Sequence, residues 1–171
     1  MAGMGRSGLK KLKYSINSRR LFRVFLGVLL FLVLMFLLFR YIVGVSLVSG
    51  NSMYPAYRDG QPVFYNRLAG SFNTGDVVSL RMPDGDFLIK RIVAVAGDTV
   101  DIIDGALYVN GNPEDGDYVN GETSADSESG VEYPLEIGDR QFFILGDNRE
   151  VSVDSRSFGA VAASQITGKI L

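Results

Sequence analysis

The chain has 171 residues, of which 47% are hydrophobic and 20 are glycine, so it is long enough for one domain with a substantial core and an added apolar segment. It contains no histidine and no cysteine, which excludes a serine–histidine catalytic pair, a thiol nucleophile and disulfide bonds. The net charge of -2 conceals an asymmetry: residues 1–50 carry eight basic residues and no acidic one, whereas residues 51–171 carry the other nine basic residues and all 19 acidic ones, a net charge of -10.

An uninterrupted apolar run extends from Val24 to Phe39, between Arg23 and Arg40. As a helix it would be about 24 Å long, and apolar flanking residues extend it toward the roughly 30 Å of a bilayer core. We therefore predict a transmembrane anchor over residues 24–43. Seven basic residues precede it, so the positive-inside rule places residues 1–23 in the cytoplasm as a basic arm and the remainder outside.

Two other interpretations of the N-terminal region are weaker. A cleaved signal peptide shares the basic start and the apolar core, but no A-x-A site follows at the right distance. A basic arm could also bind nucleic acid, but its position directly before a spanning helix favours a role in membrane topology. We expect no nucleic-acid partner.

The rest of the chain, residues 44–171, is predicted to be a mainly β domain in which short strands alternate with glycine turns from about Val45 onward. The strands predicted from alternating apolar residues are Pro62–Asn66, Val77–Met82, Phe87–Val95, Thr99–Ile103, Ala106–Asn110, Glu132–Ile137, Gln141–Leu145 and Ile166–Leu171. Asp104-Gly105 predicts a two-residue hairpin turn. Residues 111–130 are polar and acidic, which predicts an exposed loop or a small hairpin, and no helix of convincing length is predicted after residue 45.

Ser52 is the first candidate for chemistry. It lies between Gly50 and Pro55, and the glycine permits a sharp bend that would expose the hydroxyl beside backbone N–H groups able to receive an oxyanion. The same pattern is also typical of an ordinary turn.

Lys90 is the second candidate, because it interrupts the apolar run Phe87–Val95. In a regular strand it shares a face with Leu88, Ile92 and Ala94, while Arg91 points to the other face. Burial among aliphatic side chains would lower the pKa of Lys90, and the neutral amine could then accept a hydroxyl proton in place of histidine. The alternative is an edge-strand lysine whose ammonium reaches solvent.

The third candidate segment is Gly146–Gly159, with the sequence GDNREVSVDSRSFG. In the simplest interpretation, this segment is a solvated turn in which Asp154 and Arg156 form an exposed ion pair. That interpretation explains the charges, but it does not explain why the three segments occur together.

Together the segments SGNSMYP, DFLIKRIVAVAGD and GDNREVSVDSRSFG, in this order behind an anchor, resemble bacterial type I signal peptidase, the leader peptidase of the peptidase S26 family. The short acidic stretch resembles the compact Gram-positive type. The resemblance implies an antiparallel β-sheet catalytic domain of the signal-peptidase/LexA-like type, preceded by a single N-terminal transmembrane helix. It also implies Ser52 as nucleophile, Lys90 as general base, Ser152 as the residue that orients Lys90, and Asp154 and Arg156 as supports of the site.

Two positions depart from the family pattern. Gly50 stands where some members carry a serine whose hydroxyl helps to hold the oxyanion, so backbone N–H groups, including that of Ser52, would be the donors. Ala96 replaces the usual proline before Gly97-Asp98, which affects only the local turn.

The resemblance implies a membrane-bound serine endopeptidase of the bacterial cell membrane that removes signal peptides after a small residue, at an Ala-x-Ala type site. Its expected partners are secretory preproteins, membrane lipid and a nearby secretion translocon, and no metal or organic cofactor is expected. Two alternatives fit less well. A catalytically silent assembly factor for pili or surface proteins would lack Ser52 or Lys90, and both are present. A self-cleaving protease of the LexA-repressor type would lack an anchor and carry a DNA-binding domain, and neither feature fits this sequence.

Overall fold

The computed structural model describes residues 18–171 in two units, of which the first ends at Leu37 and the second comprises Leu38–Leu171. Most of the predicted basic arm, residues 1–17, lies outside the described residues. The first unit contains helix α1, Ser18–Leu37, and a π-helical turn η1, Leu38–Ile42, continues it into the second unit. Residues 18–42 form one helix long and apolar enough to cross a membrane, with a mean hydropathy of 2.8 in its most apolar window.

The helix begins six residues before the predicted anchor and ends one residue before the predicted boundary. Val43 belongs instead to strand β1, Val43–Leu47, where it pairs with Asn66 of β2, Pro62–Asn66. Gly44 makes this pairing possible, because a Cβ at this position would overlap the ring of Tyr65. Pairing with a distant strand therefore overrides the continuous apolar pattern that predicted helix through Val43.

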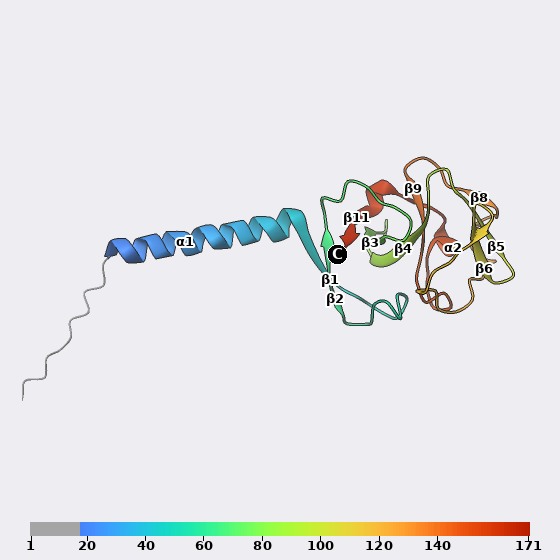
Figure 1. Cartoon of the computed structure of the whole chain (residues 1–171), viewed down its shortest axis with the longest axis horizontal. Coiled ribbons are helices and arrows are strands. Elements are labelled where there is room, and N and C mark those ends of the chain that lie inside the picture. Colours follow the sequence, from blue (N-terminus) through green and yellow to red (C-terminus); the bar gives the residue numbers. More distant parts are fainter. Residues whose placement is uncertain (1–17) are drawn as a thin grey trace, which may run out of the picture. The chain divides into compact units, whose positions relative to one another are not determined.

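The strands of the described region form two antiparallel sheets (Figure 1). The larger sheet has the order β1-β2-β11-β3-β4-β9-β10, with β3 at Val77–Arg81, β4 at Phe87–Val95, β9 at Gln141–Leu145, β10 at Val161–Ala162 and β11 at Ile166–Ile170. The smaller sheet has the order β7-β6-β5-β8, with β5 at Thr99–Ile103, β6 at Ala106–Val109, β7 at Asn112–Pro113 and β8 at Leu135–Glu136. Helix α2, Ser155–Phe158, and the 3-10 helix η2, Ala163–Gln165, complete the domain.

This architecture confirms the predicted mainly antiparallel β fold with one N-terminal apolar helix. The strands β2, β4, β5 and β9 have the predicted bounds, and the Asp104-Gly105 hairpin is confirmed by positive φ angles of 49° and 77°. β8 is shorter than predicted because Pro134, which has no N–H to donate, precedes it. No helix of convincing length was predicted after residue 45, and the two helices found there, α2 and η2, have only four and three residues.

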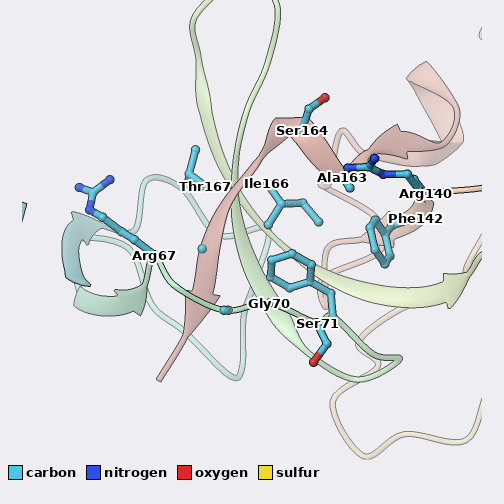
Figure 2. A pocket seen from close by; sticks show the side chains of 12 residues that line it. Arg67, Gly70, Ser71, Arg140, Phe142, Ala163, Ser164, Ile166 and Thr167 are labelled. Atoms are coloured by element: carbon cyan, nitrogen blue, oxygen red, sulfur yellow. The ribbon is translucent and has the colours of Figure 1, made fainter. Parts of the chain in front are cut away.

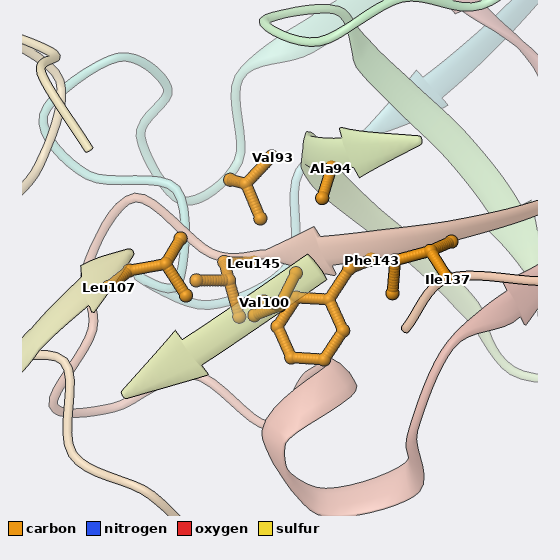
Figure 3. Close-up of a cluster of buried hydrophobic side chains, with 7 residues drawn as sticks. All are labelled: Val93, Ala94, Val100, Leu107, Ile137, Phe143 and Leu145. Atoms are coloured by element: carbon orange, nitrogen blue, oxygen red, sulfur yellow. The ribbon is translucent and has the colours of Figure 1, made fainter. Parts of the chain in front are cut away.

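One buried cluster joins the two sheets (Figure 3). Its members are Val93, Ala94, Val100, Leu107, Ile137, Phe143 and Leu145. The β4–β9 register shifts between Ile92 and Ala94, so strict alternation along β4 ends there and Val93 and Ala94 enter the same cluster. The predicted shared face of Lys90 therefore does not extend to Ala94.

Candidate active site

Ser52 lies on the loop between β1 and β2. The loop is closed at its base, where Val48 N–H donates to Gln61 O at 2.9 Å and Gly60 N–H donates to Val48 O at 2.9 Å. Gly50 has the positive φ of 78° that the predicted bend requires. Met53, the residue after Ser52, is 1% exposed and belongs to a core cluster. The half-buried serine is thus held on a turn whose next residue is fixed in the core.

The backbone N–H groups of this turn differ in availability. Gly50 N–H donates to Asp59 Oδ1 at 2.7 Å, so it is occupied. Among the residues that the structure describes, no acceptor is found for the Ser52 N–H. Ser52 N–H is therefore an available donor at this position, as an oxyanion site requires.

Lys90 lies on β4 between β3 and β9, in the interior of the larger sheet, and it is 2% exposed. This position excludes the edge-strand alternative. Its Nζ donates to Ser152 Oγ at 2.8 Å, and within residues 18–171 no carboxylate lies within ion-pair distance of it. Burial lowers the pKa of Lys90 from 10.5 to about 8, and the more distant charge of Asp154 only partly offsets this effect.

Ser52 and Lys90 line one cavity of about 240 Å³. Backbone segments 46–49 and 87–90 form its two sides, together with Met53. The loop and the strand are thus brought together around an open space, with Ser152 bonded to the lysine.

The third segment contacts the turn of Ser52 through Gly146 and Asn148, and it contacts Lys90 through Ser152. A Cβ on Gly146 would lie 2.5 Å from Ser52 O and would overlap the Ser152 hydroxyl, so only glycine allows this close approach. Asn148 N–H donates to Ser52 O at 2.9 Å, and its side-chain amide donates to Asn51 O at 3.2 Å. Residues 146–152 therefore connect the turn of Ser52 to the amine of Lys90.

Asp154 and Arg156 form a buried ion pair at 2.9 Å, with side chains 0% and 8% exposed. Asp154 caps α2 and also accepts from Gly146 N–H at 3.0 Å. Arg156 donates to Ser152 O at 3.1 Å and to Arg149 O at 2.6 Å. The pair is not the exposed turn contact of the simpler interpretation, because it holds the backbone on both sides of Ser152.

Two further ion pairs lie beside the site and were not predicted from the sequence. Arg91 binds Asp147 with two hydrogen bonds of 2.8 Å, and Arg149 binds Glu114 at 2.6 and 2.9 Å. Burial acts to lower the pKa of Arg91, but its bonds to Asp147 outweigh burial and raise it above its ordinary value. For Arg91 the available signal was its position next to Lys90 in the strand, because its side chain then points to the opposite face, where a buried guanidinium needs a carboxylate of its own.

A second cavity, of about 490 Å³, lies away from this site (Figure 2). Phe142 and Ile166 contribute apolar side chains, and Figure 2 shows Arg67 and Arg140 at opposite ends. None of Ser52, Lys90 and Ser152 lines it. In the part of the chain that the structure describes, no group of acidic side chains could hold a metal ion.

A β-rich domain that places a serine and a buried lysine in one cavity, in a chain without histidine or cysteine, is typical of serine peptidases that operate without histidine. The sequence matches the family described as "Signal peptidase, peptidase S26" over residues 21–171. It is 34% identical to Signal peptidase IB of Staphylococcus aureus over 159 residues, 81% of each chain. It is 32% identical to Signal peptidase I S of Bacillus subtilis over 152 residues, 83% of this chain and 82% of the relative.

The fold comparison agrees with the sequence comparison. A crystal structure of a signal peptidase I from Enterococcus faecalis superimposes with a TM-score of 0.51 and 28% sequence identity, covering 59% of this chain and 97% of that one. The chain belongs to the signal peptidase family, peptidase S26, and is a serine endopeptidase of the signal peptidase I type. The resemblance noted from the three sequence segments is confirmed.

Proposed function

We propose that this protein removes N-terminal signal peptides from exported preproteins with a Ser52–Lys90 dyad. The observation that carries the proposal is the shared cavity, which is lined by Ser52 and by a lysine whose pKa is lowered to about 8. An appreciable fraction of Lys90 is then neutral near pH 8, and a neutral amine is a competent general base.

In the proposed reaction the neutral Lys90 amine accepts the Ser52 hydroxyl proton as Ser52 Oγ attacks the scissile carbonyl. The Ser52 N–H receives the oxyanion of the tetrahedral intermediate. Protonated Lys90 then donates its proton to the leaving amine, which is the new N-terminus of the mature protein. Water, deprotonated by Lys90, hydrolyses the acyl-enzyme and releases the signal peptide.

The supporting residues have separate roles in this proposal. Ser152 accepts a hydrogen bond from Lys90 and fixes the direction of the amine. Asp154 and Arg156 act as positioning residues, because they hold the backbone at Gly146 and Ser152. Gly50 allows the bend that presents Ser52.

The cavity also supports a preference for small side chains. At about 240 Å³, between two segments of extended backbone, it has room for a peptide strand with small residues such as alanine before the cleaved bond. We therefore propose an Ala-x-Ala type site. Exported preproteins carry such small residues before the cleaved bond. A secretion translocon would deliver them close to the enzyme.

We propose a single-pass anchor formed by the helix at residues 18–42, with the basic N-terminal region in the cytoplasm and residues 44–171 outside the cell membrane. The helix is about 37 Å long, enough to cross a bilayer core in lipid. The excess of basic residues before it supports this orientation. In sealed inside-out vesicles, added protease should leave the β domain intact; its digestion there would contradict the orientation.

The central test is Ser52→Ala in the full-length protein. Wild type and variant are incubated in detergent with a preprotein that carries an Ala-x-Ala site, and the product is subjected to N-terminal sequencing. Wild type should release the mature N-terminus, and the variant should lose at least about 1,000-fold in rate while keeping its circular dichroism spectrum. A folded Ser52→Ala protein with wild-type turnover would refute the nucleophile assignment, and an inactive wild type would favour the assembly-factor alternative.

A further inference from the structure

The acidic segment at residues 111–130 is not only an exposed loop. Most of its residues are exposed, but Thr123 is buried, and Glu114 and Tyr118 are partly buried against the loop at residues 146–156. The prediction of an exposed acidic loop is therefore incomplete. The segment places a carboxylate directly on the loop that contacts Ser52.

We propose that Glu114 is a positioning residue for the Ser52–Lys90 site, acting through Arg149. The proposal rests on the proposed function above. Arg149 has a side chain with 0% exposure, and its guanidinium forks onto Glu114 with bonds of 2.6 and 2.9 Å. A two-bond pairing of this kind fixes direction as well as distance.

The remaining donors of Arg149 connect this pair to the site. Its Nε donates to Gly146 O at 2.9 Å, and Nη1 also donates to Thr123 Oγ1 at 2.8 Å. Gly146 is the residue in close contact with both Ser52 O and the Ser152 hydroxyl. The position of the Glu114 carboxylate is thereby transmitted to the residue that separates the nucleophile turn from the partner of Lys90.

The backbone of the acidic segment reinforces this connection. Asn120 N–H donates to Asp147 O at 2.9 Å, and Arg149 N–H donates to Asn120 O at 2.8 Å. Between these two bonds lies Asn148, whose N–H donates to Ser52 O. The donor that reaches the nucleophile turn is thus held from both neighbouring residues.

Glu114 is itself fixed from two directions. Its N–H donates to Leu107 O of β6 at 2.8 Å, and Tyr118 donates its hydroxyl to Glu114 Oε1 at 3.2 Å. The Tyr118 ring lies 4.0 Å from the Arg91 guanidinium, and Gly116 leaves the space for this ring, because a Cβ would lie 2.4 Å from it. Burial, followed by the charge of Glu114, raises the pKa of Tyr118 to about 12, so it stays a hydrogen-bond donor.

Loss of the carboxylate would leave a buried guanidinium without its counter-charge, and the bond from Arg149 Nε to Gly146 O would lose its fixed direction. A displacement of about 1 Å at a catalytic group can cost about 100-fold in rate. Glu114 does not touch the cavity that holds Ser52 and Lys90. The chemical step should therefore suffer while substrate affinity is retained.

The test is Glu114→Gln in the full-length protein, with Asp117→Asn as the matched control. Asp117 is an exposed carboxylate of the same segment, so the control has the same change of charge without the contact to Arg149. Glu114→Gln should lower kcat about 10- to 100-fold with KM changed less than about 3-fold, at a temperature where circular dichroism shows it folded. Asp117→Asn should keep the wild-type kcat.

The pH profile separates positioning from a direct electrostatic effect. Asp154, Arg156 and Asp147 are the charges that act on the pKa of Lys90, and Glu114 is not among them. The midpoint of the Glu114→Gln profile should therefore stay near that of wild type, while kcat falls at every pH. A midpoint moved by one pH unit or more would overturn the positioning role, and Glu114→Asp, which restores the charge, should recover part of kcat.

Thr123→Val gives a second decision if Glu114→Gln does not fold. It removes one acceptor of Arg149 at nearly constant shape and without a change of charge, and it should lower kcat about 2- to 5-fold. Wild-type kcat in a folded Glu114→Gln would overturn the inference, and if Glu114→Gln does not fold, wild-type kcat in Thr123→Val would overturn it. If wild type still cleaves the preprotein in a Ser52-dependent way in that case, the proposed function stands; if wild type is inactive, the proposed function itself has failed.

Discussion

The loop at residues 146–156 contacts Lys90 on one side and Arg91 on another, where it also carries Arg149 and Arg156, and the cations on the two sides are treated differently. On the arginine side, Arg91, Arg149 and Arg156 each bind a carboxylate, at 2.8, 2.6 and 2.9 Å. On the other side, Lys90 is as deeply buried but bonds only to the neutral hydroxyl of Ser152 within the described residues. Both sides lie within one short stretch of chain.

The difference follows from the cost of burying charge. A buried cation with a bonded carboxylate stays protonated and holds the backbone around it. A buried lysine without such a partner is destabilised in its charged form, so its pKa falls. The paired side is suited to fixing geometry and the unpaired side to proton transfer.

The largest expected effect comes from removing the unpaired cation. Lys90→Met keeps most of the side-chain volume and removes the base, so turnover should fall at least about 1,000-fold; Lys90→Arg should fail as well, because a guanidinium stays protonated. Wild-type kcat should rise with pH to a midpoint near the Lys90 pKa of about 8. A midpoint close to 10.5, the ordinary value, would show that the lysine is not desolvated in solution.

Lys90→Met should also be more stable than wild type at pH 7. The pKa of Lys90 is lower in the folded state than in the unfolded state, so the unfolded state binds more protons between pH 8 and 10.5. The destabilisation, about 3 kcal/mol at most, is fully present below pH 8 and disappears as pH rises through this range. After the lost bond to Ser152 is counted, urea unfolding should show Lys90→Met ahead by about 1–3 kcal/mol at pH 7, with the gap closing by pH 10.

If the difference in unfolding free energy between Lys90→Met and wild type does not change with pH, it comes from packing and not from the charge of Lys90.

The next effect concerns the paired side. Asp154→Ala strands the buried guanidinium of Arg156, and Arg156→Ala strands the buried carboxylate of Asp154, so each should cost about 3–5 kcal/mol of unfolding free energy. The double variant should cost less than the sum of the two, because the second change removes the stranded charge. Additive losses of unfolding free energy in a double-mutant cycle would show that the two residues act independently. The contrast between paired arginines and unpaired Lys90 would then be wrong for this pair.

The smallest effect is expected at Tyr133. Its ring packs on Phe143 at 6.4 Å, and its hydroxyl is buried without a hydrogen-bond partner among the described residues. Burial, then the charge of Asp154, raises the pKa of Tyr133 to about 12. Tyr133→Phe should leave kcat unchanged and raise the unfolding free energy by up to about 1 kcal/mol. A lower unfolding free energy for Tyr133→Phe than for wild type would show that the hydroxyl is hydrogen-bonded in solution.

Much of this protein follows from local sequence. A strand needs only a few alternating apolar residues, and a hairpin needs only its turn residues, so β2, β4, β5, β9 and the Asp104-Gly105 turn are predictable. The long apolar helix and the fold class follow in the same way. The absence of histidine made Ser52 and Lys90 candidates for catalysis, and the resemblance of the three segments to signal peptidase added Ser152, Asp154 and Arg156.

Tertiary structure alone decided which charges are paired. Glu114 and Arg149 are 35 positions apart, and Arg91 and Asp147 are 56 apart, so no local pattern relates them. The same is true of Val43, which an apolar run predicts as helix and a partner strand makes β. Burial of Lys90 away from a carboxylate, and the inward turn of Glu114 from a polar segment, depend on how the two sheets pack, because the free energy of a buried charge is set by neighbours that are distant in the chain.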